Sequence, residues 1–284
     1  MSGGPAGRRR RGRVGLYALV VAFTFFAAFP FLWSLITTFK SDPDLYRRDN
    51  NPFWFNEPPT LQNLDLVLNR TAFGTFVLNT AEVALYVVAI TLLVAVPAAY
   101  SLARLQGRWG GRMAIAIFFV YLIPPSLLFL SLSRVVSALD LQDSRYALVV
   151  LYPTITIPVS VWLLLGFFKS IPKDIEEQAM IDGYSRMGAF ARTVLPLAAP
   201  GMIAVVVFSA TLAASEFIYA LAFVSRTAEK TISVGVPTEL VRGDVFFWQA
   251  LQGATLVVAV PIAFVFNLFL RRFISGFTMG AVKG

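Results

Sequence analysis

Six long apolar runs alternate with polar segments along this chain. The runs cover about residues 14–38, 75–103, 113–136, 146–168, 200–224 and 248–270, and each is rich in Leu, Val, Ala and Phe. Each run is longer than the ~18 residues that mark a helix able to cross a bilayer. Because lipid offers the backbone no hydrogen-bond partners, runs of this length must be helical. The pattern therefore predicts an all-α membrane protein with six transmembrane helices.

Composition supports this class. Hydrophobic residues make up 57% of the 284 residues and charged residues only 14%, whereas a soluble domain carries about 25% charged residues. The chain has no Cys and no His, which removes disulfides and the commonest metal ligands. It also lacks the G-x-x-x-x-G-K-S/T loop that holds nucleotide phosphates. We therefore expect no metal site, no catalytic residues and no nucleotide bound by this chain.

The basic residues indicate how the spans are oriented. Residues 1–13 form a basic tail with five Arg, and the first run is too long for the ~7–15 residue apolar core of a secretory signal peptide. With the N-terminus inside, 15 of the 24 Lys and Arg residues fall in cytoplasmic segments, as the positive-inside rule requires. This orientation places segment 169–199 and the tail 271–284 in the cytoplasm. It also explains the net charge of +8 without a nucleic-acid partner.

The polar segment 169–199 predicts two short helices, of which the first carries several start and stop signals. Asp174 followed by Glu177 resembles a capping box. The carboxylates of Glu176 and Glu177 are also favoured near the positive end of a helix. Gly183 suits the position just after the helix, where the backbone turns. We therefore expect a first helix that ends in a glycine turn.

The second helix of this segment is expected from about Ser185 to Val194. It is predicted to stop at Pro196, because the residue before a proline resists the helical conformation. Two short rigid helices with exposed carboxylates would give a partner protein a surface to grip. A solvated linker between two spans explains the same spacing equally well, so the residues alone leave both readings open.

The same segment resembles the EAA loop of ABC importer permeases, through which separate ATPase subunits drive the membrane subunit. The family pattern is E-A-A, three residues, G, nine residues, then I-x-L-P, and it is matched here by Glu177, Ala179, Gly183, Leu195 and Pro196, with Asp182 completing a common Asp-Gly pair. Mild departures are Gln178, Tyr184 and Thr193. The resemblance implies that the residues coupled to the ATPase are Glu176, Glu177, Ala179, Asp182, Gly183, Phe190, Leu195 and Pro196.

The C-terminal stretch from Gly276 to Gly284 looks like the tail of maltose-type carbohydrate permeases. Together the two stretches imply a type I ABC importer permease, the second of two permease subunits that import a sugar or sugar-like solute. The implied partners are a second permease subunit, two ATP-binding cassette subunits holding ATP and Mg, and an extracellular or periplasmic solute-binding protein. The resemblance also implies a bacterial or archaeal cytoplasmic membrane, and a tail contact at Gly280, Lys283 and Gly284.

Polar and aromatic residues within the runs are candidates for the translocation path, namely Asn79, Glu82, Tyr121, Tyr152, Glu216 and Tyr219. An ionisable group at the centre of a span costs ~2.5–3.5 kcal/mol, so it usually faces a cavity or a partner. The stretch around Glu216 is similar to W-N-E/D-F-x-x-A-L in carbohydrate permeases, although Ala214 and Ser215 depart from it. A structural hydrogen bond or ion pair between spans accounts for these residues as well.

Two other functions fit so apolar a chain. A proton- or ion-coupled secondary transporter would use the carboxylates of Glu82 or Glu216, but it leaves segment 169–199 unexplained. A membrane-embedded enzyme needs a metal cluster or a pair of nucleophile and base, and the sequence offers neither. The ABC permease is therefore the preferred hypothesis, with the identity of the sugar left open.

Overall fold

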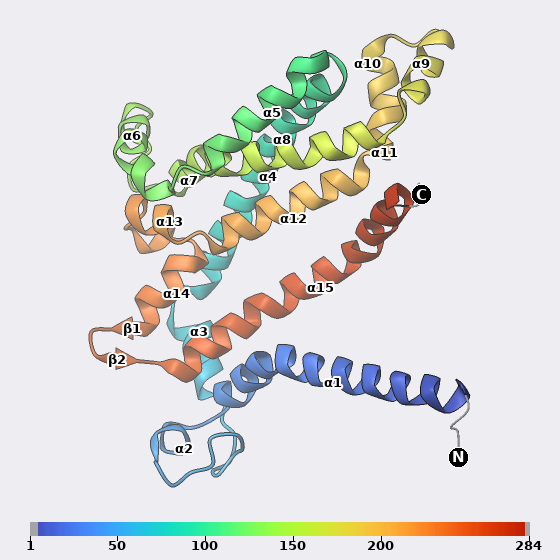
Figure 1. Cartoon of the computed structure of the whole chain (residues 1–284). Helices are drawn as coiled ribbons and strands as arrows, with labels where there is room; N and C mark the ends of the chain where they lie inside the picture. The colour runs from blue at the N-terminus through green and yellow to red at the C-terminus, as the bar shows by residue number, and fades with distance from the viewer. Residues whose placement is uncertain (1–4, 282–284) are drawn as a thin grey trace. The chain divides into compact units, whose positions relative to one another are not determined.

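The structure, a computed structural model, describes residues 5–281, which fold almost entirely into helices (Figure 1). Within this range the only sheet is a two-stranded hairpin. The chain divides into two compact units. The first comprises Met1–Thr71 and Leu240–Pro261, and the second comprises Ala72–Glu239 and Ile262–Gly284.

The first unit contains α1 (Pro5–Thr38), α2 (Asp42–Tyr46), α3 (Gln62–Arg70), a hairpin of β1 (Val241–Arg242) and β2 (Val245–Phe246), and the first turns of α15 (Trp248–Ala281). The two strands are antiparallel, and Gly243 adopts φ +60° in the turn between them, as two-residue hairpins require. The start of α15 packs closely on the end of α1, because a Cβ added to Gly253 would lie 3.0 Å from the methyl group of Thr38. A small residue at this point allows the approach.

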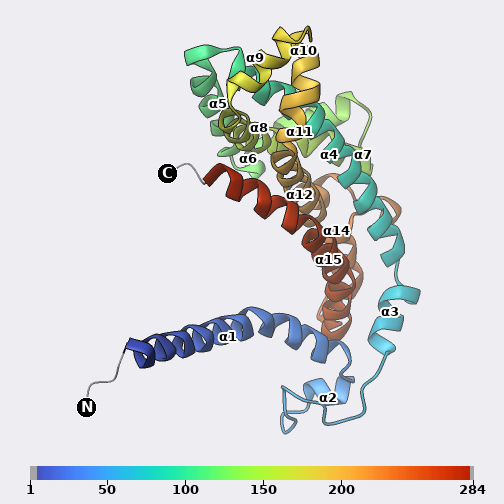
Figure 2. The ribbon, with the colours of Figure 1, turned by 90° about the vertical axis from the view of Figure 1, so that its right-hand side faces the viewer.

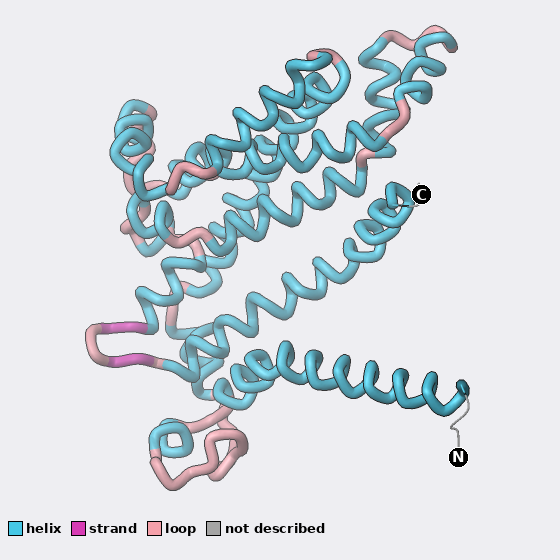
Figure 3. The backbone as a smooth tube through the Cα atoms, in the orientation of Figure 1, coloured by secondary structure: helices cyan, strands magenta, loops and turns pink. Residues whose placement is uncertain are grey.

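A buried ion pair organises the loops between α1 and α3, drawn in pink in Figure 3. The side chains of Lys40 and Asp44 are each 1% exposed, with Nζ and Oδ1 3.5 Å apart. Asp44 also accepts hydrogen bonds from the backbone and side-chain N–H groups of Asn56, and Lys40 donates to the carbonyl oxygen of Asn51 at 3.0 Å. Charges this deeply buried persist only when they are paired and hydrogen-bonded. The network thus holds these loops in place in a chain without cysteine.

The second unit contains the remaining helices, which are α4 (Phe73–Arg104), α5 (Gly107–Tyr121), α6 (Pro125–Ala138), α7 (Arg145–Leu151), α8 (Pro153–Ser170), α9 (Lys173–Ile181), α10 (Arg186–Ala189), a π-helical turn η1 (Phe190–Val194), α11 (Leu195–Leu197), α12 (Ala199–Ser215), α13 (Ile218–Phe223), a 3₁₀ turn η2 (Thr227–Glu229) and α14 (Ile232–Leu240). Helices α4, α8 and α12 pack together at its centre (Figure 2). Gly201 lets α12 approach α8, because an added Cβ would lie 2.6 Å from the ring of Phe167.

Helices correspond to all six predicted runs, but the spans differ in continuity. Within the described part of the chain, three helices are long and apolar enough to cross a bilayer unbroken, namely Gly15–Thr38, Phe73–Arg104 and Arg145–Ser170. The third run, 113–136, is a broken pair in which Trp109–Tyr121 and Ser126–Ala138 meet at 92°. This run is therefore not the single helix that its apolar length predicts.

Two prolines explain the break in the third run. Pro124 has an extended backbone with ψ 131°, because Pro125 excludes the helical conformation from the residue before it. Pro125 then begins α6, where its missing N–H group costs no hydrogen bond. The sequence carried this signal, but the apolar length of the run hid it.

The helix in the fifth predicted run, 200–224, also ends before the run does. Helix α12 stops at Ser215, and Glu216 has an extended backbone with ψ 125°. The residues that follow form the separate short helix α13. Glu216 therefore lies at a junction between two helices and not within one continuous helix.

Both predicted tails continue as helix within the described residues. Helix α1 begins at Pro5, inside the basic tail 1–13, and α15 runs through the predicted tail to Ala281. Gly280 lies on α15, whereas Lys283 and Gly284 lie outside the described residues. Helix α15 is therefore longer than the predicted span 248–270, and the boundary between the span and the tail stays a prediction.

Candidate functional site

The polar segment 169–199 forms a helix–turn–helix at one end of the second unit, beyond the ends of α8 and α12 (Figure 1). Helix α9 starts after Pro172, which has an extended backbone (ψ 137°) and makes no side-chain capping hydrogen bond. The capping box expected from Asp174 and Glu177 is therefore wrong, because Asp174 already lies inside the first turn. Carboxylates in that turn instead complement the positive end of the helix dipole.

The turn after α9 is a Schellman motif around Gly183. This residue has φ +94°, in a region that only glycine adopts freely. Its N–H group donates to the carbonyl oxygen of Met180, and that of Tyr184 donates to the carbonyl oxygen of Ala179, both at 3.1 Å. These are the two hydrogen bonds that define the motif. The glycine turn predicted from the sequence is confirmed.

The second helix of the segment runs through Pro196 instead of stopping there. Residues 190–194 form a π-helical turn, in which the N–H group of Leu195 reaches back to the carbonyl oxygen of Phe190. In a regular α-helix, Pro196 would clash with the carbonyl oxygen four residues earlier. The wider π turn relieves that clash, and such turns are frequent at functional sites. The predicted end before Pro196 is therefore wrong.

Fixed geometry at both ends sets the direction of this second helix. Its start is capped by Ser185, whose Oγ accepts a hydrogen bond from the N–H group of Gly188 at 3.2 Å. Its end meets α12 in a bend of 71° between Arg186–Leu197 and Ala199–Ser215. The segment therefore leaves the bundle at a defined angle.

Glu176 fastens α9 to the end of α4. Its side chain is buried, and it accepts a hydrogen bond from the hydroxyl of Tyr100 through Oε1. Its Oε2 lies 3.3 Å from Nε of Arg104, whose Nη2 also donates to the carbonyl oxygen of Ile171 at 2.7 Å. Glu176 is thus an internal fastening, which corrects the expectation that it is an exposed carboxylate.

An aromatic cluster surrounds this fastening. The ring of Tyr100 lies 4.3 Å from that of Phe190 and meets the ring of Phe168 edge-on at 6.0 Å, measured between centroids. The three residues come from α4, η1 and the end of α8. Such pairs contribute ~0.5–1.5 kcal/mol each beyond their burial. Both helices of the segment are therefore anchored to the membrane bundle.

The opposite side of the segment is exposed and combines acidic and apolar side chains. Ile181 is 84% and Met187 71% exposed, and Glu177 and Asp182 are exposed as well. We call these four residues the outer face. Large exposed apolar groups beside carboxylates on a rigid turn are typical of a surface that binds another protein. Ala179 is buried and packs inward.

Sequence reasoning missed Tyr100 and Arg104, the two residues that hold Glu176. They are four positions apart on α4 and so lie on the same helix face. That spacing was visible in the sequence, but nothing in it indicates that this face meets α9. Only the fold brings the three side chains together.

The residues predicted to line the translocation path do not form a single group in the structure. Glu82 belongs to a cluster of charged side chains. Its Oε2 lies 2.8 Å from Nε of Arg145, and its Oε1 accepts a hydrogen bond from the hydroxyl of Tyr146 at 2.9 Å. Nη1 of Arg145 also lies 2.9 Å from Oε2 of Glu229. The cluster joins α4, α7 and η2, so the geometry gives Glu82 a structural ion pair.

Asn79 has a similar fastening role, and Tyr121 stands apart. The Nδ2 of Asn79 donates to the carbonyl oxygens of Ala228 and Lys230 at 2.8 and 3.0 Å, so it secures the loop after α13. The exposed ring of Tyr121 contacts Phe118 on its own helix. In the described part of the chain, Tyr121 contacts neither Asn79 nor Glu82.

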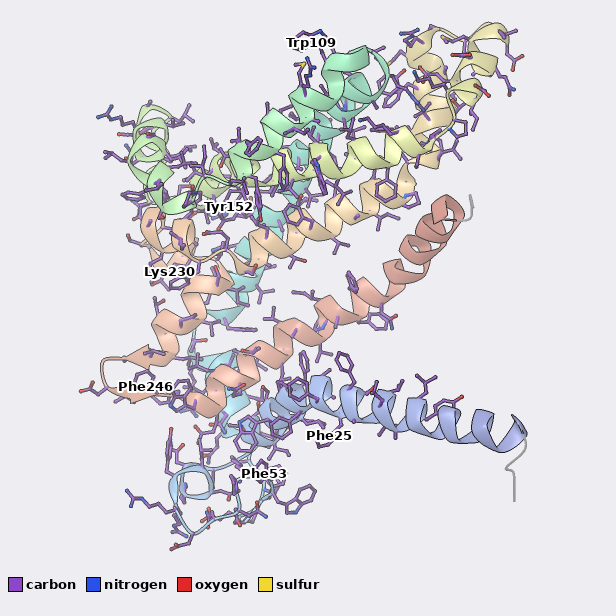
Figure 4. The ribbon with its side chains drawn as sticks, in the orientation of Figure 1. Phe25, Phe53, Trp109, Tyr152, Lys230 and Phe246 are labelled. Carbon is purple, nitrogen blue, oxygen red and sulfur yellow. The ribbon has the colours of Figure 1, made fainter. Side chains whose placement is uncertain are left out.

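Glu216, Tyr152 and Tyr219 meet at the junction between α12 and α13. The carboxylate of Glu216 accepts hydrogen bonds from the N–H groups of Ile218, Tyr219 and Ala220 at 2.8, 3.0 and 3.3 Å. Both tyrosines are fully buried. The hydroxyl of Tyr152, labelled in Figure 4, lies within electrostatic reach of Glu216 but has no well-formed hydrogen bond within the described structure.

Comparison with known proteins identifies the family. Residues 95–278 match the family described as binding-protein-dependent transport system inner membrane component. The chain is 36% identical over 257 residues to the sulfoquinovosyl glycerol transport system permease protein SmoH of Agrobacterium fabrum, covering 90% of this chain and 89% of that protein. It is 30% identical to the diacetylchitobiose uptake system permease protein DasC of Streptomyces coelicolor, with 96% of this chain and 98% of DasC covered.

Two further likenesses agree with this. The trehalose/maltose transport system permease protein MalG of Thermococcus litoralis is 30% identical, with 96% of this chain and 97% of MalG covered. The fold also matches a chain in the crystal structure of a bacterial ABC transporter involved in the import of the acidic polysaccharide alginate, with a TM-score of 0.77, 19% identity, and coverage of 96% of this chain and 100% of that one. This chain therefore belongs to the family of inner membrane components of binding-protein-dependent transport systems.

Proposed function

We propose that this chain is the permease subunit through which a separate ATPase drives the import of a sugar or sugar-like solute. The observation that carries the proposal is the geometry of segment 169–199, a rigid turn that exposes its outer face while buried side chains fasten it to α4. A loop that merely linked two spans would need neither the buried contact of Glu176 with Arg104 nor the exposed side chain of Ile181.

The outer face is the expected contact with the ATPase. Its two carboxylates can accept charge-assisted hydrogen bonds from Arg or Lys, and Ile181 and Met187 can fill apolar pockets. Movement of the ATPase would pass from α9 through Glu176 into α4, and in parallel through the π turn into α12. The coupling residues thus divide into contact residues (Glu177, Asp182) and transmitting residues (Glu176, Ala179, Gly183, Phe190, Leu195, Pro196).

The family supports the rest of the proposed assembly. We expect a second permease subunit, two ATP-binding cassette subunits that hold ATP and Mg, and an extracellular or periplasmic solute-binding protein. The tail contact at Gly280, Lys283 and Gly284 remains part of this proposal. Both termini are expected in the cytoplasm, with the chain in the cytoplasmic membrane of a bacterium or archaeon.

The solute class comes from the relatives. Those named above belong to systems for sulfoquinovosyl glycerol, diacetylchitobiose and trehalose or maltose, and each of these solutes contains a sugar ring. The relatives give no support to the proton-coupled alternative. Of the candidates for the translocation path, we retain the group of Tyr152, Glu216 and Tyr219. Asn79 and Glu82 are set aside, because their side chains already bind residues of neighbouring segments.

The test is ATP-dependent uptake by the reconstituted transporter, using the sugar that its solute-binding protein retains. We expect Glu177→Lys and Gly183→Pro each to abolish uptake, because the first reverses a contact charge and the second destroys the turn, while the chain still enters the membrane. Asp49→Lys, a charge reversal on an exposed residue of the first unit, serves as the matched control and should leave uptake unchanged. Normal uptake with both substitutions would refute the proposal.

A further inference from the structure

The first unit contains a cleft that the coupling function does not use. It has a volume of about 690 Å³ and lies between α2, α3, the β1–β2 hairpin and the start of α15. Small-molecule sites typically span ~300–1,000 Å³, so the cleft has the size of a ligand site. All its walls belong to one compact unit.

Two stacked aromatic rings line one side of this cleft. Phe246, labelled in Figure 4, and Trp248 lie parallel, with centroids 5.2 Å apart and an angle of 6° between the rings, and both are nearly half exposed. The hydroxyl of Tyr46 donates to the carbonyl oxygen of Phe246 at 3.4 Å, which ties α2 to the hairpin. Exposed aromatic surface of this kind packs well against the C–H groups of a pyranose ring.

Fixed polar groups face the same space. Oδ1 of Asp42 accepts a hydrogen bond from Nε2 of Gln249 at 2.9 Å, and Gln249 is only 2% exposed. The carboxylate is thus held in place by a buried amide. Gln62 adds an exposed amide, and Asp244 adds a second carboxylate from the hairpin turn. A few oriented polar groups beside aromatic surface are typical of a site for a small polar ligand.

The charge of the cleft narrows the class of ligand. The one cation in its wall, Arg70, is paired with Asp65, with Nε 3.0 Å from Oδ2. Among the described residues, neither Asp42 nor Asp244 has an ion-pair partner. The cleft therefore carries net negative charge, which attracts hydroxyl donors and repels anions.

We propose that this cleft is a binding site for a neutral sugar, of one or two hexose units, on the outer surface of the permease. Its segments lie between the first and second spans and between the fifth and sixth. Under the proposed orientation, both of these segments emerge on the side opposite segment 169–199. The site would hold a sugar at the membrane surface.

The test uses the full chain within its assembled transporter in lipid nanodiscs, labelled with 5-fluorotryptophan. The chain has five Trp, so each fluorine resonance can be assigned by a Trp→Phe substitution. We expect glucose and maltose to shift the Trp248 resonance saturably and to leave that of Trp54 unchanged. Trp54 is exposed on the same unit but outside the cleft. Glucuronate, which differs from glucose by one carboxylate, should need at least about tenfold higher concentration, equivalent to ~1.4 kcal/mol.

Matched variants locate the binding. Asp244→Ala should weaken glucose binding by about tenfold or more, because it removes a charge-assisted hydrogen bond, whereas Asp49→Ala should have no effect. The proposal is overturned by the absence of a saturable shift, by equal shifts at Trp54, or by equal binding of glucuronate. It is also overturned if only the solute-binding protein shifts Trp248, since the cleft would then be a protein contact. None of these results bears on ATP-dependent uptake, which tests the proposed function separately.

Discussion

The carboxylate of Glu176 and the guanidinium of Arg104 form a buried ion pair, 3.3 Å between Oε2 and Nε, that joins the first helix of the polar segment to the end of α4. The next residue, Glu177, is exposed on the outer face. Two adjacent glutamates therefore have opposite environments. The inner one connects the segment to the membrane bundle, and the outer one is available to a partner.

This contrast predicts opposite effects of the same substitution. Glu176→Ala leaves the Arg104 cation buried without its partner, which costs ~3–5 kcal/mol, so we expect a clear fall in the melting temperature of the purified protein. Glu177→Ala removes an exposed side chain and should change stability by no more than ~0.5 kcal/mol, yet it should reduce ATP-driven uptake. Thermal unfolding and uptake measured on both variants decide the point. Equal melting temperatures for the two variants would contradict the assignment.

The backbone at Gly183 makes a second prediction. With φ +94°, a β-branched residue is strained there, so Gly183→Val should cost at least ~1–2 kcal/mol and uncouple ATP hydrolysis from uptake. Gly183→Asn should be much milder, because Asn tolerates positive φ better than other residues. The ratio of sugar imported to ATP hydrolysed is the measurement. If Val and Asn behave alike, the turn geometry does not matter for coupling.

Arg145 offers a test of the charged cluster with Glu82 and Glu229. A lysine keeps the charge, but its single ammonium lacks the planar fork that reaches both carboxylates. We expect Arg145→Lys to destabilise the chain by about 1 kcal/mol, a modest value because the cluster is partly exposed. Arg226→Lys, at a more exposed ion pair with Asp143, is the control and should have a smaller effect. A larger loss at Arg226 would show that the cluster is not the stronger fastening.

Acid should weaken the loops of the first unit through Asp44. Burial raises the pKa of this carboxyl, but the side-chain and backbone N–H groups of Asn56 and the ammonium of Lys40 lower it by more, so its pKa lies below its usual value. A lowered folded-state pKa means that Asp44 stabilises the fold above its unfolded pKa of ~3.9, and that this stabilisation disappears as the pH falls through the folded-state pKa.

The measurement is the melting temperature of the wild type and of Asp44→Asn across pH. We expect the wild type to be more stable at neutral pH and the difference to shrink below about pH 4, as the carboxylate becomes protonated. A difference that stays constant down to the lowest pH would show that the charge of Asp44 does not contribute.

Local chemistry made part of this structure predictable. Apolar length indicated the helices, and the glycine at position 183 indicated its turn, because each depends on a few adjacent residues. The contact between Glu176 and Arg104 depends on two segments more than seventy positions apart in the sequence, so no spacing could reveal it. Local rules predicted a helix end before Pro196 and a continuous helix through Glu216. The folded chain instead adopts a π turn at the first position and a helix break at the second.

The most direct test of the central claim uses the absence of native cysteine. Ile181→Cys places a single thiol on the outer face, where the native side chain is 84% exposed, and it can carry a benzophenone maleimide in the assembled transporter. Leu61→Cys, at an exposed position of the first unit, is the control. We predict a photo-crosslink to the ATPase subunit from position 181 and none from position 61. Absence of that adduct, or labelling of position 181 only from outside the cell, would contradict the account.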